Sequence, residues 1–399
     1  MRGTYHRSGM YSLVVAVMVG TGCVASPVSL AKPVSVAKSV GVDIPLGLDS
    51  PVSVNSPVDV DSPVGIRVSV HATHAYRLQA ARDLLQKSPL IDGHNDLAWN
   101  ARKFLHNNLH SFNLSSDLTQ HKPWKNSPFS HTDLPRLRKG QVAAQFWSVY
   151  IPCESQYLNT VQLLLEQIDV VKRMISISST STTLVHSSAG ILEEFERGRV
   201  ASLMGVEGGH GLANSMGVLR AVYDLGVRYV TLTHKCHTPW AECSERGSQP
   251  PNTRGLTPYG KAVNGGIMMI SFYSDFLTCT PSASLRDVVA HINHVRTMAG
   301  VDYVGIGAGY DGINRTPKGL EDVSKYPELF AELLQDPTWS LQDLKKLAGL
   351  NLLRVLKRVE EVREEMAGER PSEMIIPIHD IDTRWPCRYK FASLEDTRF

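Results

Sequence analysis

Four strand-like apolar runs in this chain end in polar or glycine-rich residues, and this repeated arrangement restricts the fold more than any other feature. The first run leads into residues 91–96, which read Ile-Asp-Gly-His-Asn-Asp. The next two runs end at Glu207 and His234, and the fourth ends in glycines before Asp311. Polar groups at the carboxyl ends of successive parallel strands are typical of an α/β barrel active site. Helical patterns between the runs also indicate βα units.

The residues at the first two strand ends are suitable metal ligands. Alternate side chains of an extended strand point the same way, so we expect His94 and Asp96 to project together. With Glu207 they supply one imidazole and two carboxylates, which suits a catalytic zinc site with an open position for water. Bound water would then be acidic enough to attack a carbonyl near neutral pH. An isolated His-x-Asp also fits an ordinary strand end, and the other strand ends favour the metal site.

His234 has two interpretations. At a strand end it can be a fourth ligand or a donor to the developing oxyanion of a substrate. It can also be a core histidine that donates to a backbone carbonyl. No serine or cysteine lies in a glycine elbow with a nearby base, and Gly305, Gly307 and Gly309 lack the spacing of a phosphate loop.

Length and charge limit the function classes. A chain of 399 residues is long enough for one barrel with terminal extensions. The 41 basic and 39 acidic residues nearly balance, and no basic cluster indicates a nucleic-acid partner.

The pattern predicts six strands and five helices, whereas a closed barrel needs eight strands. The predicted strands are 89–92, 141–150, 200–206, 228–233, 266–273 and 302–307. The predicted helices are 75–87, 160–175, 215–225, 284–298 and 341–366.

The terminal segments predict an extracytoplasmic protein. Residues 1–25 have the basic start, short apolar stretch and small-residue cleavage site of a signal peptide, with a signal anchor as the alternative. Residues 26–73 repeat Ser-Pro-Val and predict a disordered or extended stalk, with a β-solenoid as the alternative. The barrel domain is predicted at 74–370. The tail at 371–399 contains Cys387 and lacks the hydrophobic end of a lipid-anchor signal.

Cysteines and glycosylation sequons agree with that compartment, because an oxidising route permits disulfides. Sequons occur at Asn113 and Asn314. After signal cleavage an odd number of cysteines remains, so at least one thiol is free or bonded to another chain. These cysteines are Cys153, Cys236, Cys243, Cys279 and Cys387.

Six separated motifs resemble those of the membrane dipeptidase family, also called renal dipeptidases. They are Ile-Asp-Gly-His-Asn-Asp at 91–96, Gln-Phe-Trp-Ser-Val-Tyr at 145–150, Gly-Val-Glu-Gly-Gly-His at 205–210, Thr-Leu-Thr-His at 231–234, Thr-Pro-Trp at 238–240 and Gly-Leu-Glu-Asp-Val-Ser at 319–324. The likeness extends from about residue 75 to Cys387, and residues 351–355 are similar to a vertebrate branch. It implies an amidohydrolase-type (β/α)8 TIM barrel with two zinc ions that cleaves dipeptides. Members are secreted, glycosylated, disulfide-linked homodimers that usually carry a GPI anchor at the plasma membrane.

The resemblance also implies roles for individual residues. His94 and Asp96 would bind the first zinc, and Glu207 would bridge both zinc ions. His234 would contact the substrate carbonyl and its transition state, and Tyr273 would line the pocket. It further implies a disulfide within the chain between Cys153 and Cys236. Cys387 would link two chains through a second disulfide.

Two departures from the family pattern affect the chemistry. The family has two βα units between the motif at 238–240 and the strand that ends at Tyr273, and they carry the second-zinc histidines and a carboxylate-binding arginine. Here the chain runs almost directly from Lys261 to Gly266. Relative to the family pattern, two units of ~30 residues, or about 60 residues, would therefore be missing. Gly309 stands where active members have the acid/base aspartate. Asp311 matches a second aspartate of that motif, to which we assign no catalytic role.

These departures predict one zinc or fewer per chain and weak or lost activity. Loss of the acid alone puts a factor of ~10²–10⁴ in rate at risk. One alternative is a non-catalytic extracellular protein that uses the scaffold for binding or adhesion. Another is a truncated isoform from splicing or an incomplete gene model. We expect the chain on the extracellular side and, without a hydrophobic tail, secreted.

Overall fold

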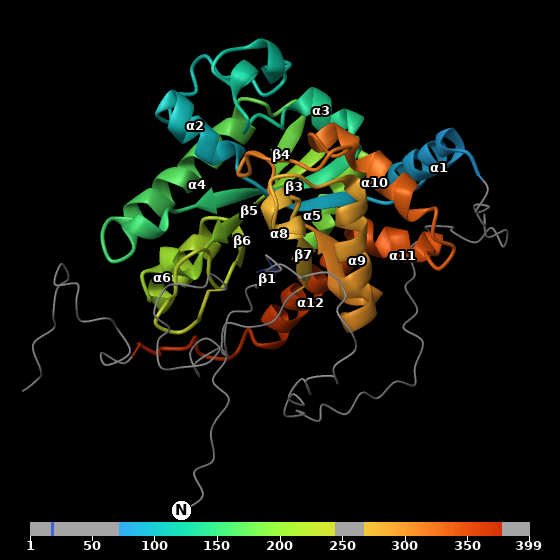
Figure 1. The fold of residues 1–399 in the computed structure, drawn as a ribbon. Coiled ribbons are helices and arrows are strands. Elements are labelled where there is room, and N and C mark those ends of the chain that lie inside the picture. Colours follow the sequence, from blue (N-terminus) through green and yellow to red (C-terminus); the bar gives the residue numbers. More distant parts are fainter. Residues whose placement is uncertain (1–16, 20–71, 244–266, 377–399) are drawn as a thin grey trace, which may run out of the picture. The chain divides into compact units, whose positions relative to one another are not determined.

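The computed structural model describes residues 17–19, 72–243 and 267–376 (Figure 1). Several predicted features lie outside these residues. They are the stalk, most of the signal peptide, the junction at 261–266 and the tail with Cys387. The domain boundaries and the interchain disulfide therefore stay predictions.

A parallel sheet of eight strands forms the centre of the described fold (Figure 1). The strand order is β1-β7-β8-β2-β3-β5-β4, and β6 pairs with β5. The strands are β1 (Val17–Val19), β2 (Leu90–Asn95), β3 (Val142–Tyr150), β4 (Thr182–Leu184), β5 (Val200–Glu207), β6 (Val227–Val230), β7 (Met268–Ile270) and β8 (Val304–Ile306). Within the described part of the chain no pairing joins β1 to β4 or β6, so this sheet is open.

All six predicted strands are present, but the count of six was too low. The two additional strands are β1 and β4. Strand β4 reads Thr-Thr-Leu and lacks the apolar run by which β7 and β8, which also have three residues each, were recognised. Strand β1 lies within the residues predicted to be a signal peptide. The parallel α/β arrangement agrees with the predicted fold class, and the sheet of the described residues is open.

Helices separate most of the strands, as expected for βα units. The α-helices are α1 (His74–Lys87), α2 (Leu97–Leu105), α3 (Leu134–Lys139), α4 (Thr160–Ser176), α5 (Ser188–Glu196), α6 (Met216–Asp224), α8 (Ser274–Thr278), α9 (Leu285–Ala299), α10 (Tyr326–Leu333), α11 (Leu341–Lys345) and α12 (Asn351–Glu365). Short 3-10 turns include η3 (Cys153–Ser155) and η4 (Gly209–Leu212).

The predicted helix at 341–366 is not continuous. A π-helical turn, η7 (Lys346–Leu350), separates α11 from α12. A Cβ atom on Gly349 would lie 2.4 Å from the carbonyl oxygen of Pro89, so glycine allows the backbone of this turn to approach the start of β2. The close approach to the sheet is a tertiary contact that helical periodicity does not reveal.

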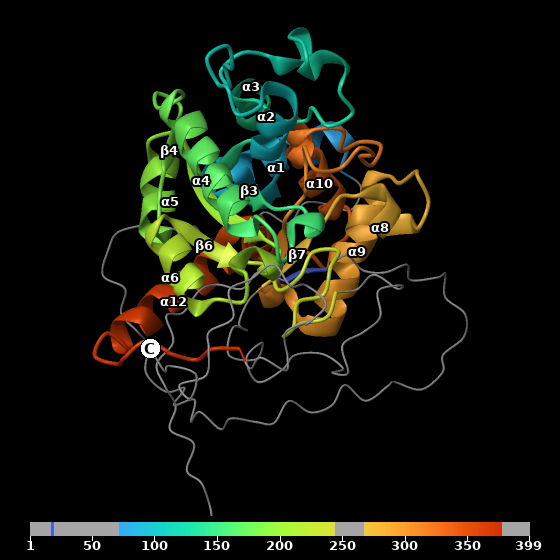
Figure 2. The same cartoon turned by 90° about the vertical axis from the view of Figure 1, so that its left-hand side faces the viewer.

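Helices pack against both the central and the outer strands. Helix α4 contacts β3 and β5, α5 contacts the same two strands, and α9 contacts β7 and β8 (Figures 1 and 2). Nearly every residue of β3 and all of β5 are buried. A parallel sheet covered in this way explains why its strands read as continuous apolar runs in the sequence.

A buried carboxylate within β2 joins three elements. Asp92 is fully buried and accepts hydrogen bonds from the backbone N–H groups of His94 (3.1 Å) and Ala308 (3.0 Å). Its other oxygen accepts from the hydroxyl of Tyr326 at 2.6 Å. Burial raises the pKa of Asp92, although these hydrogen bonds act against the shift. The carboxylate therefore connects β2 to the end of β8 and to α10, and it holds the backbone of His94 within β2.

We predict that Asp92→Ala destabilises the fold by about 3–5 kcal/mol, because several buried donors lose their acceptor together. Urea denaturation followed by circular dichroism measures the change. Asp83→Ala on the exposed face of α1 is the control, with an expected change within about 0.5 kcal/mol. Equal stability of the two variants would contradict the role of Asp92.

Candidate metal centre and active site

One imidazole and two carboxylates meet at the carboxyl ends of β2 and β5. The Nε2 atom of His94 lies 3.1 Å from Oδ2 of Asp96 and 3.3 Å from Oε2 of Glu207. All three residues offer ligand atoms within 4.8 Å of one another. The structure thus brings together the three residues predicted from the strand ends.

The backbone explains this convergence. His94 lies in β2, Asp96 is the N-cap residue of α2, and Glu207 is the last residue of β5. Strands β2 and β5 both pair with β3 in parallel, so their carboxyl ends lie at the same edge of the sheet.

A second layer of residues orients these ligands. The hydroxyl of Tyr229 donates to the carbonyl of Gly93 at 2.7 Å and lies 3.3 Å from Nδ1 of His94. Burial raises the pKa of Tyr229 to about 12, so the hydroxyl keeps its proton. Its oxygen can then accept from Nδ1–H, which leaves Nε2 of neutral His94 available to a metal. Ser148 donates to Oε2 of Glu207 at 3.0 Å.

The electrostatics are those of a site built for a cation. Burial lowers the pKa of His94, but the charges of Glu207 and Asp96 outweigh it and raise that pKa well above its ordinary value. Burial opposes the ionisation of Glu207, yet His94 and His234 hold its pKa well below the usual range. Burial and the charge of Glu207 raise the pKa of Asp96, whereas the charge of His94 acts against this shift.

The donor set fits zinc. Imidazole nitrogen and carboxylate oxygen are its ordinary ligands in catalytic sites. Among the described residues, the buried Oδ1 atom of Asp96 has no hydrogen-bond partner, as expected of an oxygen reserved for a ligand. His94, Asp96 and Glu207 would hold the ion.

A cavity of about 400 Å³ opens above these ligands. Its walls include all five residues that were predicted for metal or substrate. These are His94, Asp96, Glu207, His234 and Tyr273. The size is that of a small-molecule site.

His234 lies beside the ligands and is partly exposed. Its Nε2 atom is 3.5 Å from Oε1 of Glu207, and its ring packs edge-on to Tyr150 with centroids 5.2 Å apart. Within the described part of the chain, its Nδ1 atom has no hydrogen-bond partner. The position agrees with a role toward substrate and not with a core histidine that donates to a backbone carbonyl.

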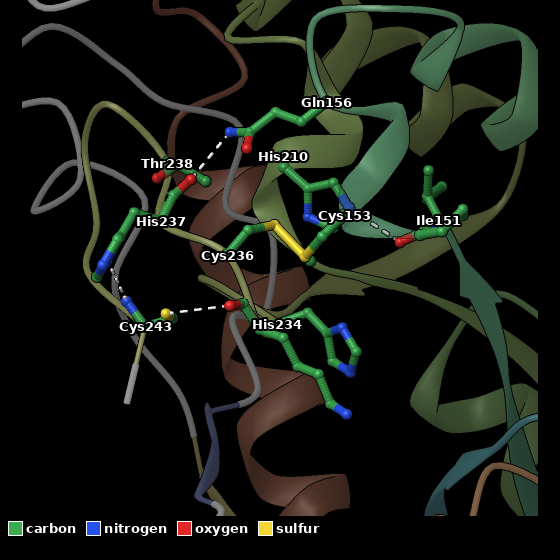
Figure 3. Close-up of a disulfide and its surroundings, with 12 residues drawn as sticks. Ile151, Cys153, Gln156, His210, His234, Cys236, His237, Thr238 and Cys243 are labelled. Carbon is green, nitrogen blue, oxygen red and sulfur yellow. Dashed lines mark hydrogen bonds between the residues drawn. A yellow bond between two sulfur atoms is a disulfide. The ribbon is translucent and has the colours of Figure 1, made fainter. Parts of the chain in front are cut away.

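A disulfide ties the His234 loop to the end of β3. Cys153 in η3 and Cys236 are bonded, with Cα atoms 5.8 Å apart, and this is the pair that the resemblance implies (Figure 3). His210 lies next to the disulfide, and its Nε2 atom is 2.9 Å from the carbonyl oxygen of Ile151. The bridge restricts the position of the loop that carries His234.

The two predicted glycosylation sites are exposed, as acceptors must be. Asn113 lies in the segment after α2, and Asn314 lines the cavity. Glycosylation at either position stays a prediction.

Gly309, where the resemblance places an acid in active members, lies at the cavity wall. Gly309 lines the cavity with a φ of +78°, and a Cβ atom there would find its nearest neighbour, Oγ of Ser271, at 3.7 Å. Asp311 also lines the cavity, and burial raises its pKa to about 7 against hydrogen bonds that lower it.

Sequence reasoning missed several residues of this site. Tyr229 and Ser148 orient the ligands, and neither carries a local signal, because each reaches the site from a different strand. Trp99 and Lys103 also line the cavity, and the helical spacing from Asp96 was the signal that could have identified them.

Comparison with known proteins identifies the family. The sequence matches "Membrane dipeptidase (Peptidase family M19)" over residues 78–263 and 262–370. The chain belongs to this family. Dipeptidase 3 of Rattus norvegicus is 36% identical over 360 residues, which cover 75% of this chain and 71% of the relative. Dipeptidase 3 of Homo sapiens is 37% identical over 366 residues, covering 76% and 72%.

Solved structures of dipeptidases have a similar fold. A metallopeptidase titled "dipeptidase AC" superimposes with a TM-score of 0.56 at 18% identity, covering 68% of this chain and 98% of that one. The probable dipeptidase PvdM from Pseudomonas aeruginosa superimposes with a TM-score of 0.60 at 14% identity, covering 72% and 99%. Membership in this metallopeptidase family makes the chain a dipeptidase by descent and implies a metal, typically zinc. Among the described residues, no helix is both long and apolar enough to cross a bilayer.

A buried histidine behind the cavity wall gives the fold a dependence on pH. Nδ1 of His131 accepts a hydrogen bond from the backbone N–H of Asp311 at 3.0 Å, so the ring must be neutral. Burial lowers the pKa of His131 to about 4, and the nearby Arg136 acts in the same direction.

We predict that His131 makes the fold less stable as the pH falls from about 6.5 to about 4. Unfolded chains bind this proton near pH 6.5, so the contribution is complete above that pH and is lost toward the folded pKa, by up to about 3 kcal/mol. Asp311 contributes to the pH dependence of stability with the opposite sign, because its raised pKa favours the folded state at low pH. Urea denaturation between pH 4 and 7 measures the free energy of unfolding. This free energy should fall less steeply toward low pH in His131→Gln than in wild type. An unchanged slope, or the same change in the exposed control His110→Gln, would contradict the assignment.

Proposed function

We propose that this chain is a zinc metallodipeptidase in which hydrolysis is slow or lost. One zinc or fewer would be held by His94, Asp96 and Glu207. The observation that carries this proposal is the meeting of one imidazole and two carboxylates beneath a cavity of dipeptide size.

A single metal position agrees with the ligands that are available. In the ranges that the structure describes, two groups of three residues come close enough to hold an ion. One is the proposed site, and the other consists of Cys153, His210 and Cys236, whose two sulfurs are joined in the disulfide. No second set of histidines adjoins Glu207 within the described residues.

The residues around the site favour peptide hydrolysis. Bound zinc would supply an acidified water and polarise the scissile carbonyl. His234 would donate to the oxyanion that develops on that carbonyl, since its ring lies beside Glu207. Tyr273 would line the pocket for the substrate side chains. The residue that would move the proton is absent, because Gly309 has no side chain.

The comparison supports the proposed loss of an internal segment. The family match consists of two parts that meet at residues 262–263, where two βα units are predicted to be missing. The alignment with the rat relative runs over 360 residues, although 75% of a 399-residue chain is only about 300 residues. The relative therefore has residues in this alignment that face no residue of the chain.

The cellular context is part of the same proposal. Secretion, glycosylation at Asn113 and Asn314, and a homodimer linked through Cys387 would agree with the predicted signal peptide. A non-catalytic binding protein is the second candidate, favoured by the absence of an acid at Gly309. A transcript boundary between Val263 and Asn264 would identify a truncated isoform.

We predict that purified protein binds at most one zinc per chain, as measured by mass spectrometry of the metal after dialysis. His94→Ala and Glu207→Gln should each reduce binding at least tenfold, because each removes a ligand of the only proposed site. His110→Ala, an exposed histidine outside the cavity, is the matched control. Two tightly bound zinc ions in wild type would refute the single-site proposal.

We predict that Gly309→Asp raises dipeptide hydrolysis by about 10–100-fold, because it places an acid at the cavity wall. Cleavage of Ala-Ala with and without a chelator measures the gain. Gly309→Ala is the control, since it introduces the same backbone strain at positive φ without the acid. Rapid chelator-sensitive cleavage by wild type, with no gain in the aspartate variant, would contradict the proposed defect.

A further inference from the structure

One face of α2 lines the cavity along its whole length. Asp96 at the N-cap, Trp99 and Lys103 all contribute to the cavity wall. Their spacing of three and four residues places them on the same side of a helix. The helix therefore presents a metal-ligand candidate, an aromatic ring and an ammonium group in a row.

The ammonium of Lys103 is held over an aromatic ring. Its Nζ atom lies 4.2 Å from the ring centroid of Phe129, which also lines the cavity. Among the described residues, no ion pair involves Lys103. Burial lowers its pKa, while the charges of Asp96 and Asp311 act in the opposite direction. A cation thus faces the cavity without a carboxylate bound to it.

We propose that the ammonium of Lys103 binds the free C-terminal carboxylate of the substrate. This would select dipeptides over peptides whose carboxyl end is blocked. The inference rests on the proposed dipeptidase function and identifies the residue that binds the C-terminal end of the substrate.

The distances along the helix agree with a dipeptide. Asp96 and Lys103 are seven residues apart, or about 10 Å along a helix axis at 1.5 Å per residue. Side chains lean toward the helix N-terminus, so the long side chain of Lys103 reaches back toward Asp96. The scissile carbonyl and the terminal carboxylate of a dipeptide are separated by one residue, at most about 3.6 Å, and an ionic hydrogen bond adds about 2.8 Å. A longer peptide would place its carboxylate beyond the ammonium.

Aromatic side chains connect the two ends of this binding path. Trp99 packs edge-on to Tyr150 at 4.9 Å, and Tyr150 packs edge-on to His234 at 5.2 Å. All three line the same cavity as Lys103. These rings form an apolar wall between the two ends of the path, while Lys103 itself is exposed to solvent.

Lys235 is the other lysine of the described cavity wall. It follows His234, which is proposed to act on the scissile carbonyl, so it lies at the reactive end of the path. Lys103 lies seven residues after Asp96 on α2, and its ammonium is held over the ring of Phe129. The geometry therefore favours Lys103 for the carboxylate.

The test compares two probes that differ only in the carboxyl group. They are a phosphinate mimic of Ala-Ala and its C-terminal amide, titrated calorimetrically into the zinc-loaded full chain. Wild type should bind the acid about tenfold or more tightly than the amide. In Lys103→Met the two affinities should agree within about twofold, with binding of the amide unchanged. The preference of wild type should also shrink as salt is raised.

Matched variants make the outcome specific. Lys87→Met, at the exposed end of α1, should behave as wild type, and Lys103→Gln should reproduce Lys103→Met. The inference is overturned if wild type shows no preference or binds neither probe. It is also overturned if Lys103→Met keeps the preference or weakens both probes equally, or if Lys235→Met abolishes the preference instead.

The readouts separate this inference from the proposed function. If Lys103 does not bind the carboxylate, zinc content and chelator-sensitive cleavage are unaffected. Only the ratio of the affinities for the acid and the amide then differs from the expected value. The dipeptidase proposal fails if wild type does not bind zinc at His94. It also fails if neither wild type nor the Gly309→Asp variant cleaves Ala-Ala. In that case the ratio measured for free Ala-Ala and Ala-Ala amide still reports on Lys103.

Discussion

The hydrogen bonds of the buried Asp92 carboxylate are the constraint on which the site depends. They join β2 to the end of β8 and to α10, and they hold the backbone of His94 within β2. An unsatisfied carboxylate at this depth would cost several kcal/mol, so the arrangement persists only with all its donors in place. The ligand geometry is therefore a consequence of how three elements pack and not of β2 alone.

Close packing at the strand ends leaves little freedom for the ligands. A Cβ atom on Gly312 would lie 2.0 Å from Oδ2 of Asp96, so only glycine lets the β8 loop come this near to the carboxylate. On the other side, Tyr229 holds the ring of His94 and Ser148 holds Glu207. Such a surrounding shell orients ligands before a metal arrives, which is consistent with a metal cradle inherited from the family.

The proposed loss of activity concerns groups needed for catalysis, whereas several residues of the cavity wall remain available for binding. Gly309 removes one acid, and the predicted deletion removes a second set of ligands, yet the aromatic path from His234 to Trp99 remains. A protein with this combination can retain recognition of a dipeptide after the rate of hydrolysis has fallen. Binding and catalysis depend on different residues here, and the experiments on Lys103 and Gly309 address them separately.

The local pattern of the sequence was sufficient for six of the eight strands and for the candidate ligands His94, Asp96 and Glu207. Burial of a parallel strand and the polarity of its end are both local properties. The local pattern was not sufficient for β4, for the π-helical turn at Gly349 or for the support that Tyr229 gives to His94. Each of these arises from contacts between residues far apart in the chain. Lys103 is the intermediate case: its helical spacing from Asp96 is visible in the sequence, but only packing against Phe129 directs its ammonium into the cavity.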